Sequence, residues 1–164
     1  MAFTASDIKN LREMTGAGMM ECKKALTECN GNIDEAAKYL KEKGLAAAAK
    51  RADRATAEGR LFMRQEGNKI YVVEMTCETD FVANNADFVA LGEKMLDVTI
   101  AKGYTKVEDE HNKMLEDLKV SIRENMNVAK VEVIDVPSDA AASFYIHSDK
   151  KTGAVVVVKG SNAD

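Results

Sequence analysis

Few residues in this sequence of 164 amino acids could do covalent chemistry. Acid–base and nucleophilic catalysis need a base beside a nucleophile, and the only two histidines are His111, expected inside a helix, and His147, expected at a strand end. His111 is in register with an apolar helix face, which favours a buried or half-buried structural role. His147 meets a polar turn, where side chains contact partners, although a surface histidine without a role fits equally well. We therefore expect no enzyme.

Metal, redox and nucleotide sites are not indicated either. The three cysteines, Cys22, Cys29 and Cys77, lack C-x-x-C spacing and are an odd number in a chain without an export signal, so we expect reduced structural thiols. The Gly16-Ala17-Gly18 segment is too short for a phosphate-binding loop and follows a helix instead of a strand. The sequence predicts no metal, no cofactor and no direct nucleotide binding.

The most informative segment is EMTCETDFVANNADF, residues 74–88, between a predicted hairpin and a predicted helix. Thr79 or Asp80 can accept hydrogen bonds from the first amides of that helix, which places Phe81 and Val82 at its outer end. The pattern leaves two interpretations of Phe81 open. It is either an exposed anchor for a partner or a side chain folded back as a hydrophobic staple or core residue.

Three short helices are predicted ahead of this segment. Thr4 and Asp7 form a T-x-x-D capping box, Asn32 and Glu35 form an N-x-x-E variant, and Gly44 is expected to end the third helix. Apolar residues recur three and four positions apart on each helix: Ile8, Leu11, Met14; Met19, Cys22, Leu26, Cys29; Ile33, Ala36, Ala37, Leu40. A bundle this small has little core, so we expect residues 1–45 to be a docking module.

The remaining chain changes its pattern. Residues 46–59 are alanine-rich and locally basic, which favours a helical linker over a phosphate-binding strip. A hairpin is predicted at residues 60–76. Two amphipathic helices follow, and the first is expected to be capped by Thr79 or Asp80 and to end near Gly103. Three more strands are predicted after the helices. The sequence therefore predicts an α+β fold, with helices packed against an antiparallel sheet.

Composition narrows the function further. Hydrophobic residues make up 46% and charged residues 30%, and no apolar run approaches the roughly 20 residues of a membrane span. With no signal-peptide core at its start, the chain is expected to be cytoplasmic and not membrane-bound. The formal charge of −4 argues against nucleic acid and suits a protein partner. Nothing follows the strand Ala154 to Val158 to cover it, so we expect a shortened chain and leave homodimerisation open.

Two stretches resemble the bacterial elongation factor Ts family: LREMTGAGMMECKKALTECNGNIDEAAKYLKEKG and CETDFVANNADF. The resemblance continues through KRADRATAEG, ENMNVAKVEVI, FYIH and GAVVVVKG, and so covers essentially the whole chain in family order. It implies a ubiquitin-associated-like three-helix module at 1–45, a linker at 46–59, the N-terminal core subdomain at 60–138 and an incomplete C-terminal subdomain at 139–164. The helical hairpin and C-terminal module of longer members have no counterpart.

The resemblance implies guanine-nucleotide exchange on the translational GTPase elongation factor Tu, without cleavage of a covalent bond. The implied exchange motif, inserted between helices of the GTPase to disturb its magnesium site, is Thr79, Asp80, Phe81 and Val82. The implied secondary contacts are Arg12, Met19 and Met20 for docking and His147 for the phosphate-binding region. Met19 and Met20 could equally fill the core of the small bundle.

Two departures from the family pattern and two rival functions accompany this expectation. Asn84 stands where members commonly have a basic residue, and the turn at 148–151 lacks the usual glycines. A ubiquitin-associated-type recruitment module without exchange activity would keep its binding after Phe81→Ala. An RNA-associated factor would depend on Lys50, Arg51 and Arg54 and on low salt.

Overall fold

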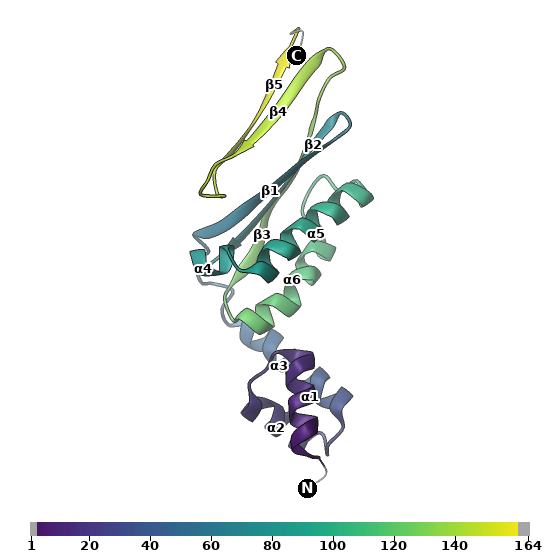
Figure 1. Cartoon of the computed structure of the whole chain (residues 1–164), viewed down its shortest axis with the longest axis vertical. Helices are drawn as coiled ribbons and strands as arrows, with labels where there is room; N and C mark the ends of the chain where they lie inside the picture. The colour runs from purple at the N-terminus through teal and green to yellow at the C-terminus, as the bar shows by residue number, and fades with distance from the viewer. Residues whose placement is uncertain (1–2, 161–164) are drawn as a thin grey trace. The chain divides into compact units, whose positions relative to one another are not determined.

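A computed structural model describes residues 3–160 and divides the chain into two compact units (Figure 1). The first comprises Met1–Asp53 with Glu116–Glu124, and the second comprises Arg54–Leu115 with Asn125–Asp164. The first unit is helical and the second combines helices with antiparallel strands, so the predicted α+β class is confirmed.

The first unit contains helices α1 (Ala5–Thr15), α2 (Met19–Glu28) and α3 (Ile33–Ala49). The capping box is confirmed: Thr4 N–H donates to the Asp7 carboxylate at 2.7 Å, and Asp7 N–H donates to the Thr4 hydroxyl at 3.3 Å. Asn32 accepts from Glu35 N–H at 3.1 Å, which is the N-cap half of the predicted N-x-x-E box. The apolar faces meet in one core, formed by Leu11, Cys22, Ala25, Leu26, Ala36 and Leu40.

The expectation that Gly44 ends the third helix is wrong, because α3 continues to Ala49. A Cβ added at Gly44 would lie 2.5 Å from a methyl group of Val120 in the same unit, so this glycine permits a close approach and does not terminate the helix. The helical linker expected at 46–59 is therefore mostly absent. Residues 50–53 form turns, and the first strand already begins at Glu58.

The second unit has a three-stranded antiparallel sheet of β1 (Glu58–Glu66), β2 (Lys69–Cys77) and β3 (Met126–Asp135), with β2 in the centre. The predicted hairpin is confirmed, since β1 and β2 pair through a turn at 67–68. The last two strands, β4 (Ala140–Ile146) and β5 (Gly153–Lys159), form a second antiparallel pair.

Both faces of the three-stranded sheet are covered within the second unit. Helix α5 (Ala86–Lys102) packs on β1 and β2, and Figure 1 shows it lying along the sheet. On the other face, Ile70, Val72 and Val136 form a core with Phe144 and Val155 from the β4–β5 hairpin. Because β2 is buried on both faces, its sequence KIYVVEMTC is almost continuously apolar instead of alternating.

The single helix expected from Thr79 to Gly103 is two helices. A short helix α4 (Asp80–Ala83) follows Thr79, and α5 starts again from its own cap at Asn85. Helix α6 (Asp109–Ile122) follows and contributes to both units. Among residues 3–160 no helix is long and apolar enough to cross a membrane.

Candidate partner-binding site

The predicted exchange motif forms a single helical turn that is held at both ends. The Thr79 hydroxyl accepts a hydrogen bond from Val82 N–H at 3.4 Å, as expected for an N-cap. At the other end, the side-chain amide of Asn84 donates to the Asp80 carbonyl at 2.9 Å, and the backbone N–H of Asn84 donates to the same oxygen at 3.1 Å. Asn84 thus caps the turn.

Burial changes abruptly along this turn. Phe81 is 84% exposed, whereas Val82 is 8% and Ala83 6% exposed. Val82 and Ala83 anchor α4, which packs against β1 and β2, and Phe81 projects away from that anchor. The interpretation of Phe81 as a staple or core residue is therefore wrong. Asp80 is also exposed, so an aromatic ring and a carboxylate stand together on one rigid turn.

The segment leading into the motif is fixed by residues that the sequence reasoning missed. The Glu78 carboxylate accepts from Asn125 N–H at 2.6 Å and lies 3.6 Å from the Arg54 guanidinium. The Asn125 side chain in turn donates to the Arg54 carbonyl at 2.7 Å. Next to Glu78, the Cys77 thiol donates to the Thr79 carbonyl at 3.1 Å. Glu78, Asn125 and Arg54 are far apart in sequence, so no local pattern could reveal their contacts.

His147 lies at the end of β4, next to a turn that is attached to β1. Leu61 N–H donates to the Lys150 carbonyl at 2.8 Å, and Lys151 pairs with Glu58 at 2.8 Å. Inside the turn, the Asp149 carboxylate accepts from the backbone amides of Lys151 at 2.9 Å and of the next residue at 3.0 Å. These contacts give the turn a defined conformation although residues 148–151 contain no glycine.

The histidine itself is exposed. Its Nδ1 lies 2.9 Å from the hydroxyl of Tyr145, and its backbone N–H donates to the Thr152 carbonyl at 2.8 Å. The pKa of Lys151 in this turn is raised, first because Glu58 accepts its hydrogen bond and also through the negative charge of Asp80. The His147 turn is therefore tied to the start of β1 by the Lys151–Glu58 pair.

The secondary candidates in the first unit are also exposed. Met19 is 58% and Met20 75% exposed, so the interpretation that they fill the core is wrong, and Arg12 lies on the surface of α1. Met14 was expected on the buried face but is 55% exposed, at the last turn of α1. On the same helix, Leu11 is part of the core and Ile8 packs against it. These four side chains belong to a different compact unit from the exchange motif.

In the part of the chain that the structure describes, the side chains suited to covalent or metal chemistry do not form a cluster. His111 is wholly buried and bonded to the Thr99 hydroxyl at 2.9 Å, which confirms the structural interpretation. Cys22 and Cys77 are buried and Cys29 is half-buried. Among residues 3–160, no three His, Cys, Asp or Glu side chains form a group that could hold a metal. The exposed arrangement offers apolar area and a carboxylate to another molecule.

Known proteins resemble this chain over its whole length. The family model described as Elongation factor TS matches residues 78–164. Elongation factor Ts of Treponema denticola is 52% identical over 164 residues, covering 100% of this chain and 59% of that protein. The Treponema pallidum (strain Nichols) protein of the same name is 44% identical over 167 residues, covering 95% and 58%. That of Nitratidesulfovibrio vulgaris (strain DP4) is 40% identical over 158 residues, covering 95% and 54%. The chain thus spans somewhat more than half the length of these relatives.

Proposed function

The chain belongs to the elongation factor Ts family, and from this premise we propose that it acts in translation elongation as a guanine-nucleotide exchange factor for elongation factor Tu. The observation that carries the proposal is the rigid turn α4, whose Phe81 is 84% exposed beside two buried neighbours. Translation also places the proposed site of action in the cytoplasm. No nucleic-acid, membrane or direct nucleotide contact is part of the proposal.

Exchange requires only differential binding. A factor that binds the nucleotide-free GTPase more tightly than the GDP form weakens GDP binding by the same factor, because the coupling between two ligands is reciprocal. A thousandfold effect corresponds to a coupling of about 4 kcal/mol. Exchange of this kind needs neither a proton transfer nor a nucleophile.

The proposed step is insertion of α4 into the GTPase. Burial of Phe81 would supply apolar contact area, and Asp80 would accept hydrogen bonds from the displaced helix. Thr79 would cap the turn, and the buried side chain of Val82 would anchor it to the rest of the protein. Displacing a helix that holds magnesium ligands leaves the phosphate charge uncompensated, so GDP dissociates faster.

Two further contacts complete the proposal. His147, on its fixed turn near the start of β1, would reach toward the phosphate-binding region of the GTPase. Arg12, Met19 and Met20 would dock the three-helix module, and the exposed Met14 joins them. Methionine suits such a surface because its flexible, polarizable side chain adapts to irregular partners.

The test is release of fluorescent GDP from elongation factor Tu, chased with excess unlabelled GDP. We expect the wild-type chain to accelerate release and Phe81→Ala to abolish the acceleration. Val156→Ala is the matched control, because Val156 is also exposed, at 56%, but lies on β5. Thermal unfolding of all three proteins shows whether each is folded. Acceleration that survives Phe81→Ala would place the exchange surface elsewhere, and failure of the wild type to bind would overturn the proposal.

The exposed methionines favour one alternative, a recruitment module without exchange activity. In that case Phe81→Ala would leave binding to elongation factor Tu unchanged, whereas joint replacement of Met14, Met19 and Met20 by Ser would abolish it. Isothermal titration of both variants separates the two functions. An exchange factor should instead retain weak docking but lose accelerated GDP release when Phe81 is removed.

A further inference from the structure

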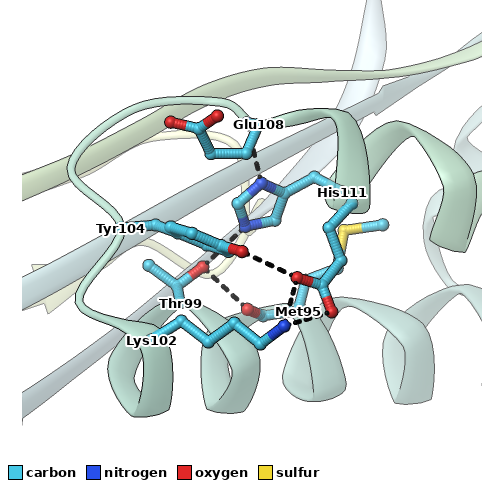
Figure 2. Close-up of polar contacts among 7 residues, drawn as sticks. Met95, Thr99, Lys102, Tyr104, Glu108 and His111 are labelled. Carbon is cyan, nitrogen blue, oxygen red and sulfur yellow. Dashed lines mark hydrogen bonds and ion pairs between the residues drawn. The ribbon is translucent and has the colours of Figure 1, made fainter.

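One histidine lies outside every contact proposed above and is enclosed at the junction of α5 and α6. His111 is 0% exposed, and both of its ring nitrogens have partners, as Figure 2 shows. Nδ1 accepts from the backbone N–H of Glu108 at 3.0 Å, and Nε2 lies 2.9 Å from the Thr99 hydroxyl oxygen. The ring thus joins the last turns of α5 to the first turn of α6.

These contacts define the protonation state of the ring. An acceptor at Nδ1 carries no proton, so a neutral ring has its single proton on Nε2. The Thr99 hydroxyl donates its own proton to the Met95 carbonyl at 2.8 Å, which leaves its oxygen free to accept from Nε2–H. Every donor therefore has an acceptor only in the neutral Nε2–H form. A proton added to Nδ1 would face the Glu108 N–H, donor against donor.

The same bond starts a helix. His111 is the third residue of α6, and it accepts from the N–H of Glu108, the residue just before the helix. In a capping box this position is held by Glu or Gln, whose side chain reaches back to that same amide. Here an imidazole replaces it, and an imidazole changes charge between pH 5 and 8.

Charged groups around the ring come from three segments. Lys102 at the end of α5 pairs with Glu110 of α6 at 2.8 Å, and Tyr104 from the connection donates to Glu110 at 2.8 Å. The Tyr104 ring meets the imidazole edge-on, with 5.4 Å between centroids. Burial lowers the pKa of His111, opposed by the negative charges of Glu110 and Glu108. Glu110 itself has a lowered pKa, chiefly because of its bond from Lys102, so it stays ionised in this range.

We propose that His111 is a pH-sensitive latch, which holds the first turn of α6 on α5 while the ring is neutral and releases that turn when the ring is protonated. The direction follows from the burial. Because the unfolded chain takes up the proton at a higher pH than the folded chain, stability falls as the pH drops below the ordinary histidine value of about 6.5. The loss stops once the pH is below the folded pKa.

The chain offers a matched experiment because it contains only two histidines. Urea unfolding between pH 8 and pH 5.2 is measured for the wild type, His111→Gln and His147→Gln. Glutamine can accept from Glu108 N–H but does not titrate. We expect the unfolding constant of the wild type to rise with acid, by at most about tenfold per pH unit. His147→Gln should behave the same, and His111→Gln should lose this rise.

A second measurement tests the latch even if His111→Gln fails to fold. Long-range proton–nitrogen NMR of the wild-type rings should show His111 as the Nε2–H tautomer at pH 8. On acidification, protonation of His111 should coincide with faster hydrogen exchange of the amides in the first turn of α6. An Nδ1–H tautomer, unchanged exchange on protonation, or a pH dependence that persists in a folded His111→Gln variant would each overturn the proposal.

Discussion

Helices α4 and α5 are neighbours in sequence and each carries a phenylalanine, but the two phenylalanines differ in solvent exposure. Phe81 on α4 is 84% exposed, whereas Phe88 on the first turn of α5 is wholly buried. Both helices begin with a side-chain cap, Thr79 for α4 and Asn85 for α5. The difference is that α5 is long enough to lay a whole face on the sheet, while α4 is one turn whose buried positions are already taken by Val82 and Ala83.

The comparison indicates that an exposed aromatic side chain can bind a partner more tightly when the turn that carries it is already ordered. An exposed Phe on a frayed loop would lose conformational entropy when a partner orders it, and that cost weakens binding. On α4 the turn is ordered beforehand by hydrogen bonds at both of its ends. The core beneath α5 thus contributes to stability, and the tip at α4 is available for recognition.

The largest effect on stability is expected for Phe88→Ala. Removing a fully buried ring loses its transfer free energy and leaves a cavity, so the free energy of unfolding should fall by about 3–5 kcal/mol. Urea unfolding followed by circular dichroism measures this loss. A change below about 1 kcal/mol would mean that Phe88 does not anchor α5, and the contrast with Phe81 would fail.

A smaller loss is expected for Gly92→Ala, which tests how closely α5 approaches the sheet. A Cβ at Gly92 would lie 2.0 Å from the Phe62 ring, so the ring or the helix must move. We expect a loss of about 1–3 kcal/mol from overpacking, partly offset by the better helix propensity of Ala. Adding Phe62→Leu should recover part of the melting temperature. Greater stability of Gly92→Ala alone would contradict the close contact.

The start of α5 is tested by Asn85→Ala. The Asn85 carboxamide oxygen accepts from Asp87 N–H at 2.8 Å and from Phe88 N–H at 3.2 Å, so its loss should cost about 1 kcal/mol. Asn84→Ala is the matched control, because that neighbour is exposed and its side chain bonds only the Asp80 carbonyl among the described contacts. Equal thermal shifts for the two variants would remove the distinction between a capped α5 and a continuous helix.

The smallest effect on stability is expected for Phe81→Ala. Because the ring is mostly exposed, the unfolding free energy should change by less than about 0.5 kcal/mol, although GDP release should no longer be accelerated. Denaturant unfolding and the release assay on one preparation measure both quantities. A stability loss comparable with that of Phe88→Ala would show that the ring packs on the protein and would undermine its proposed role.

Local patterns predicted much of the fold because they depend on neighbours in the chain. The capping box of Thr4 and Asp7, the hairpin around 67–68 and the α+β class are all confirmed. The same reasoning was wrong about Gly44, because a glycine that ends a helix and a glycine that admits a side chain from another segment are identical in sequence. Only the contact with Val120 tells them apart.

By itself, the sequence determined the caps at Thr4 and Asn32, the hairpin around residues 67–68 and which residues form the T-D-F-V motif, and it favoured a structural role for His111. Capping, turn formation and hydrophobic periodicity act over a few residues, so their signals are local. Tertiary structure alone decided that Phe81 is exposed while Phe88 is buried, and that both nitrogens of His111 are bonded. Burial depends on which faces meet across the fold, and in this chain the deciding partners lie far along the sequence or on another element.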